Sequence, residues 1–143
     1  MDSNSNKKQM DDPLQTITEE KIREAGGQIT FEQAFEYVCS EYVSKRIVWP
    51  SICEVRAEVE GNYGKYVTGF QPLKNGITRT FCSCPAEKQF CKHAAALGIT
   101  RVQDPETFFN MESLPEMLKK KSRKELEELI MQIIYKRTEC RPC

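Results

Sequence analysis

The stretch that decides the fold covers residues 81–93 and reads Phe81-Cys82-Ser83-Cys84-Pro85-Ala86-Glu87-Lys88-Gln89-Phe90-Cys91-Lys92-His93. Two cysteines one residue apart are followed, after six residues, by a cysteine and a histidine one residue apart. Zinc in proteins prefers four sulfur or nitrogen ligands at the corners of a tetrahedron. The spacing therefore predicts one structural zinc ion bound by Cys82, Cys84, Cys91 and His93.

The neighbours of these residues suit a closed metal site. Pro85 ends any strand that reaches Cys84, so the first pair lies where a strand stops. The second pair lies at the start of a helical segment, whose N-terminus favours thiolate charge. His93 is the only histidine of the chain. Because four protein ligands leave no open coordination position, the predicted site is structural rather than catalytic.

Three other interpretations of the cluster are weaker. The thiols could be ordinary buried side chains beside an incidental histidine. A disulfide between Cys82 and Cys84 would close a strained loop. A thiol nucleophile with His93 as its base would need an oxyanion-stabilising element, and the sequence offers no motif for one.

A β-sheet is predicted directly before the cluster. Residues 52–60 alternate apolar and charged side chains, as in a half-buried strand. Residues 65–70 and 77–82 read as two further strands, and glycine-containing turns at 61–64 and 71–76 join the three. The pattern predicts a three-stranded antiparallel meander, the smallest sheet expected to be stable when helices cover it.

Helical patterns flank this sheet on both sides. Thr18 is a good N-cap for a short helix that ends at Gly26-Gly27. A second helix is predicted from Thr30, with Gln33 completing a capping box and an apolar stripe reaching Tyr42. After the cluster, a helix is predicted over residues 91–101, and one or two helical turns within 113–121. A helix rich in leucine and isoleucine follows, and it begins with the capping box of Ser122 and Glu125.

These elements predict an α+β fold: a meander that leads into a zinc knuckle, with N-terminal and C-terminal helices covering the sheet. We expect one domain over residues 17–137, with its core at about 52–101. Residues 1–16 are expected to be a disordered tail and 138–143 a second tail.

Composition limits the classes of protein to consider. The 143 residues contain seven cysteines and carry a net charge of zero. No apolar run approaches the roughly 20 residues of a membrane span, so no membrane association is expected. The N-terminus does not resemble a secretory signal, which favours an intracellular location: the cytoplasm, or the nucleus in a eukaryote. Cys39 is expected in the core or at its boundary, Cys53 in the core, and Cys140 and Cys143 in a flexible tail.

The ligand pattern resembles the SWIM zinc finger family. The similarity rests on Phe81-Cys82-Ser83-Cys84-Pro85 and on Phe90-Cys91-Lys92-His93-Ala94-Ala95-Ala96-Leu97, and extends more loosely over 47–83 and 114–134. The resemblance implies a ββα zinc unit and binding of nucleic acid or protein. This finger occurs in chromatin-remodelling helicases, Mutator-type transposases, a ubiquitin-ligase kinase class and a recombination accessory complex.

The resemblance leaves two functions open. The first is an adaptor that binds a protein partner, and this partner itself acts on nucleic acid. Direct binding of DNA or RNA is the alternative, since basic residues are in excess near the cluster. The candidates for that surface are Lys74, Arg79, Lys88, Lys92 and Arg101. The isoelectric point of about 6.6 is low for a nucleic-acid-binding domain. No enzyme motif is present, and the oligomeric state is open.

Overall fold

A computed structural model describes residues 13–73, 76–86 and 89–139. The chain forms two compact units, one ending at Met111 and the other beginning at Glu112. The predicted domain limits stay predictions. Within the first unit, Leu14 is 5% exposed and belongs to the core, so ordered packing reaches into the segment predicted as a tail.

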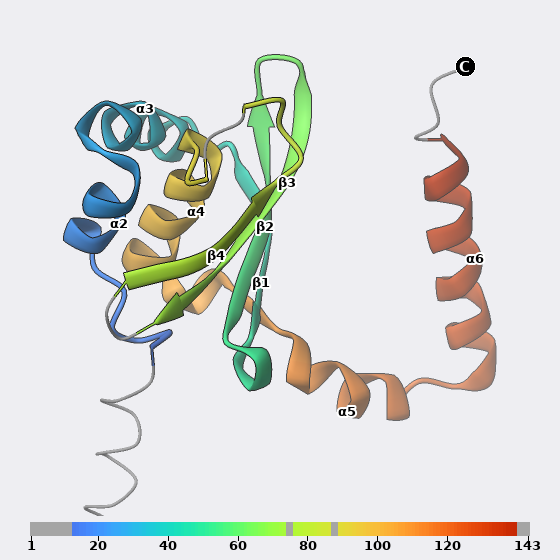
Figure 1. Ribbon diagram of the computed structural model, residues 1–143. Coiled ribbons are helices and arrows are strands. Elements are labelled where there is room, and N and C mark those ends of the chain that lie inside the picture. The colour runs from blue at the N-terminus through green and yellow to red at the C-terminus, as the bar shows by residue number, and fades with distance from the viewer. Residues whose placement is uncertain (1–12, 74–75, 87–88, 140–143) are drawn as a thin grey trace, which may run out of the picture. The chain divides into compact units, whose positions relative to one another are not determined.

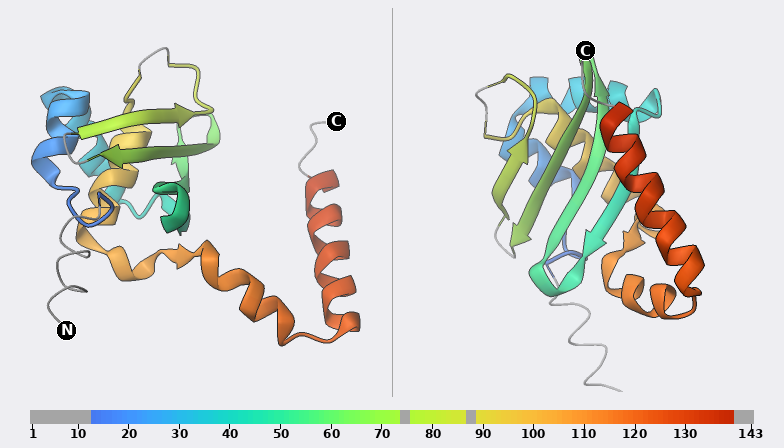
Figure 2. Two further views of the ribbon diagram at one scale, coloured as in Figure 1. Left: turned by 60° about the horizontal axis from the view of Figure 1, so that its bottom comes forward. Right: turned by 90° about the vertical axis from the view of Figure 1, so that its right-hand side faces the viewer.

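A five-stranded sheet forms one layer of the first unit (Figures 1 and 2). Its order is β4-β3-β2-β1-β5. The strands are β1 (Val43–Trp49), β2 (Glu54–Gly61), β3 (Gly64–Leu73), β4 (Gly76–Cys82) and β5 (Phe109–Asn110). Strands β1 to β4 pair antiparallel in chain order, and β5 pairs parallel with β1.

The α+β prediction is confirmed, and the three predicted strands correspond to β2, β3 and β4. The sequence did not indicate β1 or β5. Strand β1 contains a register shift between Ser44 and Ile47, with Lys45 at a positive φ of 49°. That irregularity interrupts the alternation of apolar and polar residues on which strand prediction depends.

The second layer consists of three helices on one face of the sheet (Figure 1). They are α2 (Glu19–Gly26), α3 (Gln28–Cys39) and α4 (Lys92–Gln103). Thr18 caps α2 as predicted, because its side chain accepts a hydrogen bond from the backbone N–H of Lys21 at 3.2 Å. Two short 3₁₀ helices, η1 (Pro50–Ile52) and η2 (Pro105–Thr107), join the larger elements.

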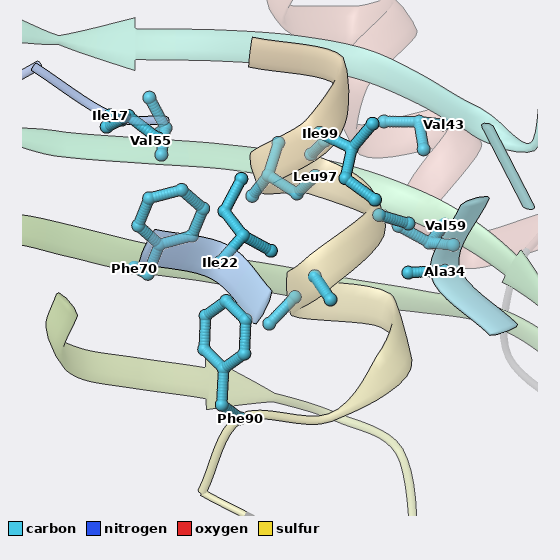
Figure 3. Close-up of a cluster of buried hydrophobic side chains, with 14 of the residues drawn as sticks. Ile17, Ile22, Ala34, Val43, Val55, Val59, Phe70, Phe90, Leu97 and Ile99 are labelled. Carbon is cyan, nitrogen blue, oxygen red and sulfur yellow. The ribbon is translucent and has the colours of Figure 1, made fainter. Parts of the chain in front are cut away.

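Helix α4 is the centre of the core. Residues 93–100 are all buried, so the helix is enclosed by the sheet on one side and by α2 and α3 on the other. Its small residues Ala94, Ala95 and Ala96 allow close approach to both layers. Larger side chains fill the remaining space around it (Figure 3): Ile22, Val55, Val59, Phe70, Phe90, Leu97 and Ile99.

The strand register assigns side chains to the two faces of the sheet. Val55 pairs with Phe70 and Ala57 with Thr68, and all four are buried beneath the helices. Alternate residues point away from the helices. Residues on this outer face include Arg56, which pairs with Gly69, and Phe81, which pairs with Gly69 from the other side. We call this second surface the outer face of the sheet.

Helix α3 differs from its prediction. It begins at Gln28 with Gly27 at the N-cap, so the predicted capping box at Thr30 does not form; Thr30 is buried instead. The helix ends at Cys39, and Tyr42 lies beyond it. Residues 28–30 form the first turn of α3, and the Thr30 side chain lies next to Gly26 instead of capping a helix end.

The two cysteines outside the metal cluster are less buried than expected. Cys39 is exposed at the end of α3. Cys53 is only partly buried, precedes β2 with a left-handed φ of 52°, and its thiol donates a hydrogen bond to the Pro72 carbonyl at 3.4 Å. Cys39 therefore lies outside the core, whereas Cys53 packs against its edge.

The 3₁₀ helix η3 spans Met111–Ser113, and its last two residues belong to the second unit. The second unit also contains α5 (Leu114–Lys119) and α6 (Arg123–Glu139). The predicted capping box of α6 is confirmed, with Ser122 and Glu125 exchanging hydrogen bonds of 3.2 and 3.3 Å. On α6, Leu126 and Leu129 are partly buried, and Ile130, Ile133 and Ile134 are exposed. Its predicted packing on the sheet stays a prediction.

Among the described residues, no helix has the length and apolar character needed to cross a membrane. Cys140, Cys143 and residues 1–12 of the predicted tail lie outside the described residues.

The central position of α4 can be tested by truncating Leu97, which is fully buried. Leu97→Ala is expected to lower the free energy of unfolding by about 2–5 kcal/mol, because it leaves a cavity in the core. Urea denaturation of the zinc-loaded protein measures this change. Ile29→Ala is the matched control, since Ile29 is 74% exposed and its truncation should cost less than about 0.5 kcal/mol.

Candidate metal centre

The four predicted ligands lie at the junction between β4 and α4. Cys82 is the last residue of β4, and Cys84 follows in the loop. Cys91 is the N-cap of α4, with extended backbone angles, and His93 is the second residue of that helix. A strand end and a helix start are thus brought to one point, as the sequence predicted.

The loop between the pairs is tied to its surroundings. The Ser83 N–H donates to the Val67 carbonyl at 3.0 Å, and the Val67 N–H donates to the Ser83 hydroxyl at 2.9 Å. Phe90 is 5% exposed and lies edge-on to Phe70, with ring centroids 6.1 Å apart. Phe90 therefore anchors the loop in the core, and the Thr80 hydroxyl hydrogen-bonds to the Gln89 carbonyl.

The ligand atoms converge closely enough to share one ion. The three sulfurs and one imidazole nitrogen all lie within 4.8 Å of one another. The Nδ1 atom of His93 is 3.7 Å from the Cys82 sulfur and 3.8 Å from the Cys91 sulfur. A zinc tetrahedron with bonds of about 2.3 Å to sulfur and about 2.0 Å to nitrogen has sulfur–nitrogen edges of about 3.5 Å. The cluster is therefore consistent with one zinc ion, held by His93 through Nδ1.

The thiols of Cys82 and Cys91 interact strongly with each other. A hydrogen bond from Cys82 lowers the pKa of Cys91 to about 3, and the His93 ring and the N–H groups of Ala94 and His93 act in the same direction. The hydrogen bond with Cys91, together with burial, raises the pKa of Cys82 well above its usual range. The pair loses one proton readily and holds the second, because two adjacent thiolates repel. A bound cation removes that repulsion.

His93 is held by aromatic rings that the sequence analysis did not identify. Its ring lies 5.5 Å from that of Tyr37 on α3 and 4.9 Å from that of Tyr66 on β3. The residue is 4% exposed, and among the described residues its Nε2 has no hydrogen-bond partner. These contacts leave Nδ1 as the nitrogen that faces the sulfurs.

Gly61 permits this packing. A Cβ built there would lie 2.4 Å from the Tyr66 ring and 3.1 Å from His93 Nε2. Sequence spacing gave no signal for Tyr37, Tyr66 or Gly61, because they reach His93 only through tertiary packing. From the sequence, Gly61 is predicted only as part of the turn at 61–64.

Three of the five residues predicted to form a basic surface are described, and the surface itself stays a prediction. Lys92 lies beside the metal cluster, with its ammonium 5.5 Å from the Tyr37 ring centroid. Arg101 is nine residues further along α4, about 14 Å away at the usual helical rise, and its guanidinium lies over Phe108. Arg79 is on β4. Lys74 and Lys88 lie outside the described residues.

Comparison with known protein families agrees with the geometry. Residues 62–99 match the SWIM zinc finger, a stretch that runs from the β2–β3 turn into α4 and includes all four ligand residues. No curated protein and no solved structure matches the chain.

Metal analysis tests the centre directly. The purified protein is expected to contain about one zinc ion per chain, and Cys82→Ser or Cys91→Ser should lose it, because a neutral hydroxyl replaces a thiolate ligand. Cys39→Ser is the control, since that exposed cysteine is not part of the cluster and its loss should leave the zinc content unchanged. Wild-type protein without zinc would contradict the assignment.

Proposed function

Because residues 62–99 carry a SWIM zinc finger, we propose that the chain is an interaction module that binds a protein partner through the outer face of its sheet. The zinc has a structural role, since a site with four protein ligands has no position for a substrate. The proposal assigns the chain no catalytic step. The partner is a protein that itself works on nucleic acid, as the family resemblance implies.

The observation that carries this proposal is the exposure of apolar side chains on the outer face. Trp49, Val67, Phe81 and Phe109 lie on it according to the strand register, with exposed fractions of 41%, 40%, 38% and 37%. Aromatic residues are enriched in the cores of protein–protein interfaces. Within the described first unit, all three helices lie on the opposite face.

The charges of the same face favour a protein over a polyanion. Glu58 forms an ion pair of 2.6 Å with Lys45, and Glu54 one of 3.0 Å with Arg56. Positive and negative groups therefore alternate beside the apolar residues. A surface of mixed sign fits a polypeptide with complementary charges, whereas a phosphate backbone requires an excess of basic groups.

The zinc site helps to hold this face in shape. Phe81 immediately precedes the ligand Cys82, so the metal fixes the end of the strand that presents it. Gly69 lies under the Phe81 ring, where a Cβ would be 2.5 Å from its Cζ atom. The Arg56 guanidinium covers the ring at 4.8 Å from its centroid. The aromatic side chain is thus held in one position before a partner binds.

Direct binding of nucleic acid is the second candidate, and one observation favours it. A shallow cavity of about 320 Å³ on the outer face combines Arg56, Arg79 and Phe81, which are groups that contact phosphates and stack on bases. Glu54 lines the same cavity and would repel phosphate. Binding of a protein partner at the outer face therefore has better support than binding of nucleic acid.

Affinity capture from native extract, with and without nuclease, distinguishes the two candidates. The wild-type protein is expected to recover one stoichiometric protein whether or not nuclease is present. Trp49→Ala combined with Phe109→Ala should reduce recovery at least about tenfold, because interface aromatics contribute most of the binding free energy.

The matched control is Ile29→Ala combined with Tyr63→Ala, which removes two apolar side chains that are 74% and 90% exposed elsewhere on the same unit. This variant should recover the partner normally. Loss of recovery on nuclease treatment, together with binding of a single-stranded oligonucleotide that weakens steeply with salt, would favour the second candidate. Equal recovery by both double variants would contradict docking at the outer face.

A further inference from the structure

A second candidate binding site lies beside the metal centre, away from the outer face. It is a cleft of about 560 Å³ between the C-terminal end of α3 and the β2–β3 turn, both at the same end of the unit in Figure 1. Its volume falls within the range of about 300–1,000 Å³ that is usual for ligand pockets. We propose that this cleft binds an organic cation, a guanidinium or alkylammonium group.

Two tyrosines supply the aromatic wall of the cleft. Tyr37 and Tyr42 line it, with ring centroids 5.7 Å apart and planes inclined at 65°. The faces of such rings carry partial negative charge and attract cations. The structure already contains one example, since the Lys92 ammonium lies 5.5 Å from the Tyr37 centroid. The wall therefore has the electronic character that a cation requires.

Carboxylates supply the opposite charge. Glu36 of α3 and Glu60 of β2 both line the cleft, and among the described residues neither forms an ion pair with a basic side chain. Glu60 lies opposite Lys65 in the strand register, on the side of β2 that carries Arg56 and Glu58. Lys92 is the one basic residue in the described lining, so the charge of the cleft is negative. The metal centre behind Tyr37, with three thiolates and one zinc ion, would add a further negative charge.

The end of α3 acts in the same direction. A helix C-terminus carries partial negative charge, which basic residues in the last turn usually offset. Helix α3 has twelve residues and no basic residue in its last turn. Its final residues Glu36, Tyr37 and the C-cap Ser40 line the cleft, so this end of the helix faces the proposed site. The carbonyls of Glu36 and Tyr37 also accept backbone hydrogen bonds from Ser40 and Tyr42.

Backbone hydrogen bonds hold the two sides of the cleft together. The Tyr42 N–H donates to the Tyr37 carbonyl at 3.1 Å, and the Tyr42 carbonyl accepts from the Glu60 N–H at 2.9 Å. Tyr42 therefore links α3 to β2. Because Tyr37 also contacts His93, the cleft is built on the same residues that the metal orders. A cation would enter a largely preformed site.

Titration with cationic probes tests the proposal. A blocked tetra-arginine peptide is added to the zinc-loaded, ¹⁵N-labelled protein, and backbone amide shifts are followed by NMR. We expect saturable shifts at Tyr37, Tyr42 and Gly61, and none with a blocked tetra-glutamine peptide. Glu36→Gln combined with Glu60→Gln should weaken binding about fivefold, because two partly exposed ion pairs are lost.

The control variant is Glu24→Gln combined with Glu106→Gln, which removes the same charge from the same unit at exposed residues outside the cleft. Its affinity should match that of the wild type. Equal weakening in both double variants would show general electrostatic attraction and would overturn the proposal. Saturable shifts confined to other residues, or the absence of binding, would overturn it as well.

Two further arms refine the assignment. Lys92→Met removes the resident cation from the Tyr37 ring. The affinity for the tetra-arginine peptide should therefore rise, provided that the zinc content is unchanged. An unchanged or lower affinity would contradict the role given to Lys92.

Spermidine presents alkylammonium groups without a polypeptide. Tighter binding of tetra-arginine identifies a basic segment of a protein as the source of the cation, and tighter binding of spermidine identifies a free polyamine.

Discussion

Tetrahedral ligation at the junction of β4 and α4 is the constraint on which the first unit depends. Cys82 ends the strand, and Cys91 and His93 begin the helix, so one ion joins the sheet to the helix that fills its core. Zinc binding by finger peptides contributes about 10–16 kcal/mol, which is comparable to the whole stability of a small domain.

The metal also sets the positions of groups that take no part in ligation. Tyr37 and Tyr66 contact His93, and Phe81 precedes Cys82 in the chain. Two surfaces follow from this arrangement: the outer face of the sheet and the cleft beside α3. Both are proposed binding surfaces, and both include residues close to the metal ligands. A structural ion would therefore influence the proposed binding only indirectly, through the side chains that its ligands place.

The sequence predicted the parts of the structure that local patterns specify. The ligand spacing indicated the metal centre, and alternation of apolar residues indicated β2. Capping residues located α2 and α6, through Thr18 and Ser122. Strand β1 escaped prediction because a register shift breaks its alternation, and β5 because two residues are too few for any pattern. Thr30 resembled a cap, but burial beneath Gly26 places it inside α3. Tyr37 and Gly61 reach the metal centre through tertiary contacts that periodicity does not encode.

X-ray absorption at the zinc edge tests the central claim most directly, because it reports the identity and distance of the ligand atoms in the native protein. We expect three sulfur atoms at about 2.3 Å and a single nitrogen or oxygen atom at about 2.0–2.1 Å, together with the outer-shell scattering of one imidazole ring. That result would establish a closed structural centre formed by Cys82, Cys84, Cys91 and His93. A bound water oxygen, or fewer than three sulfur ligands, would contradict it.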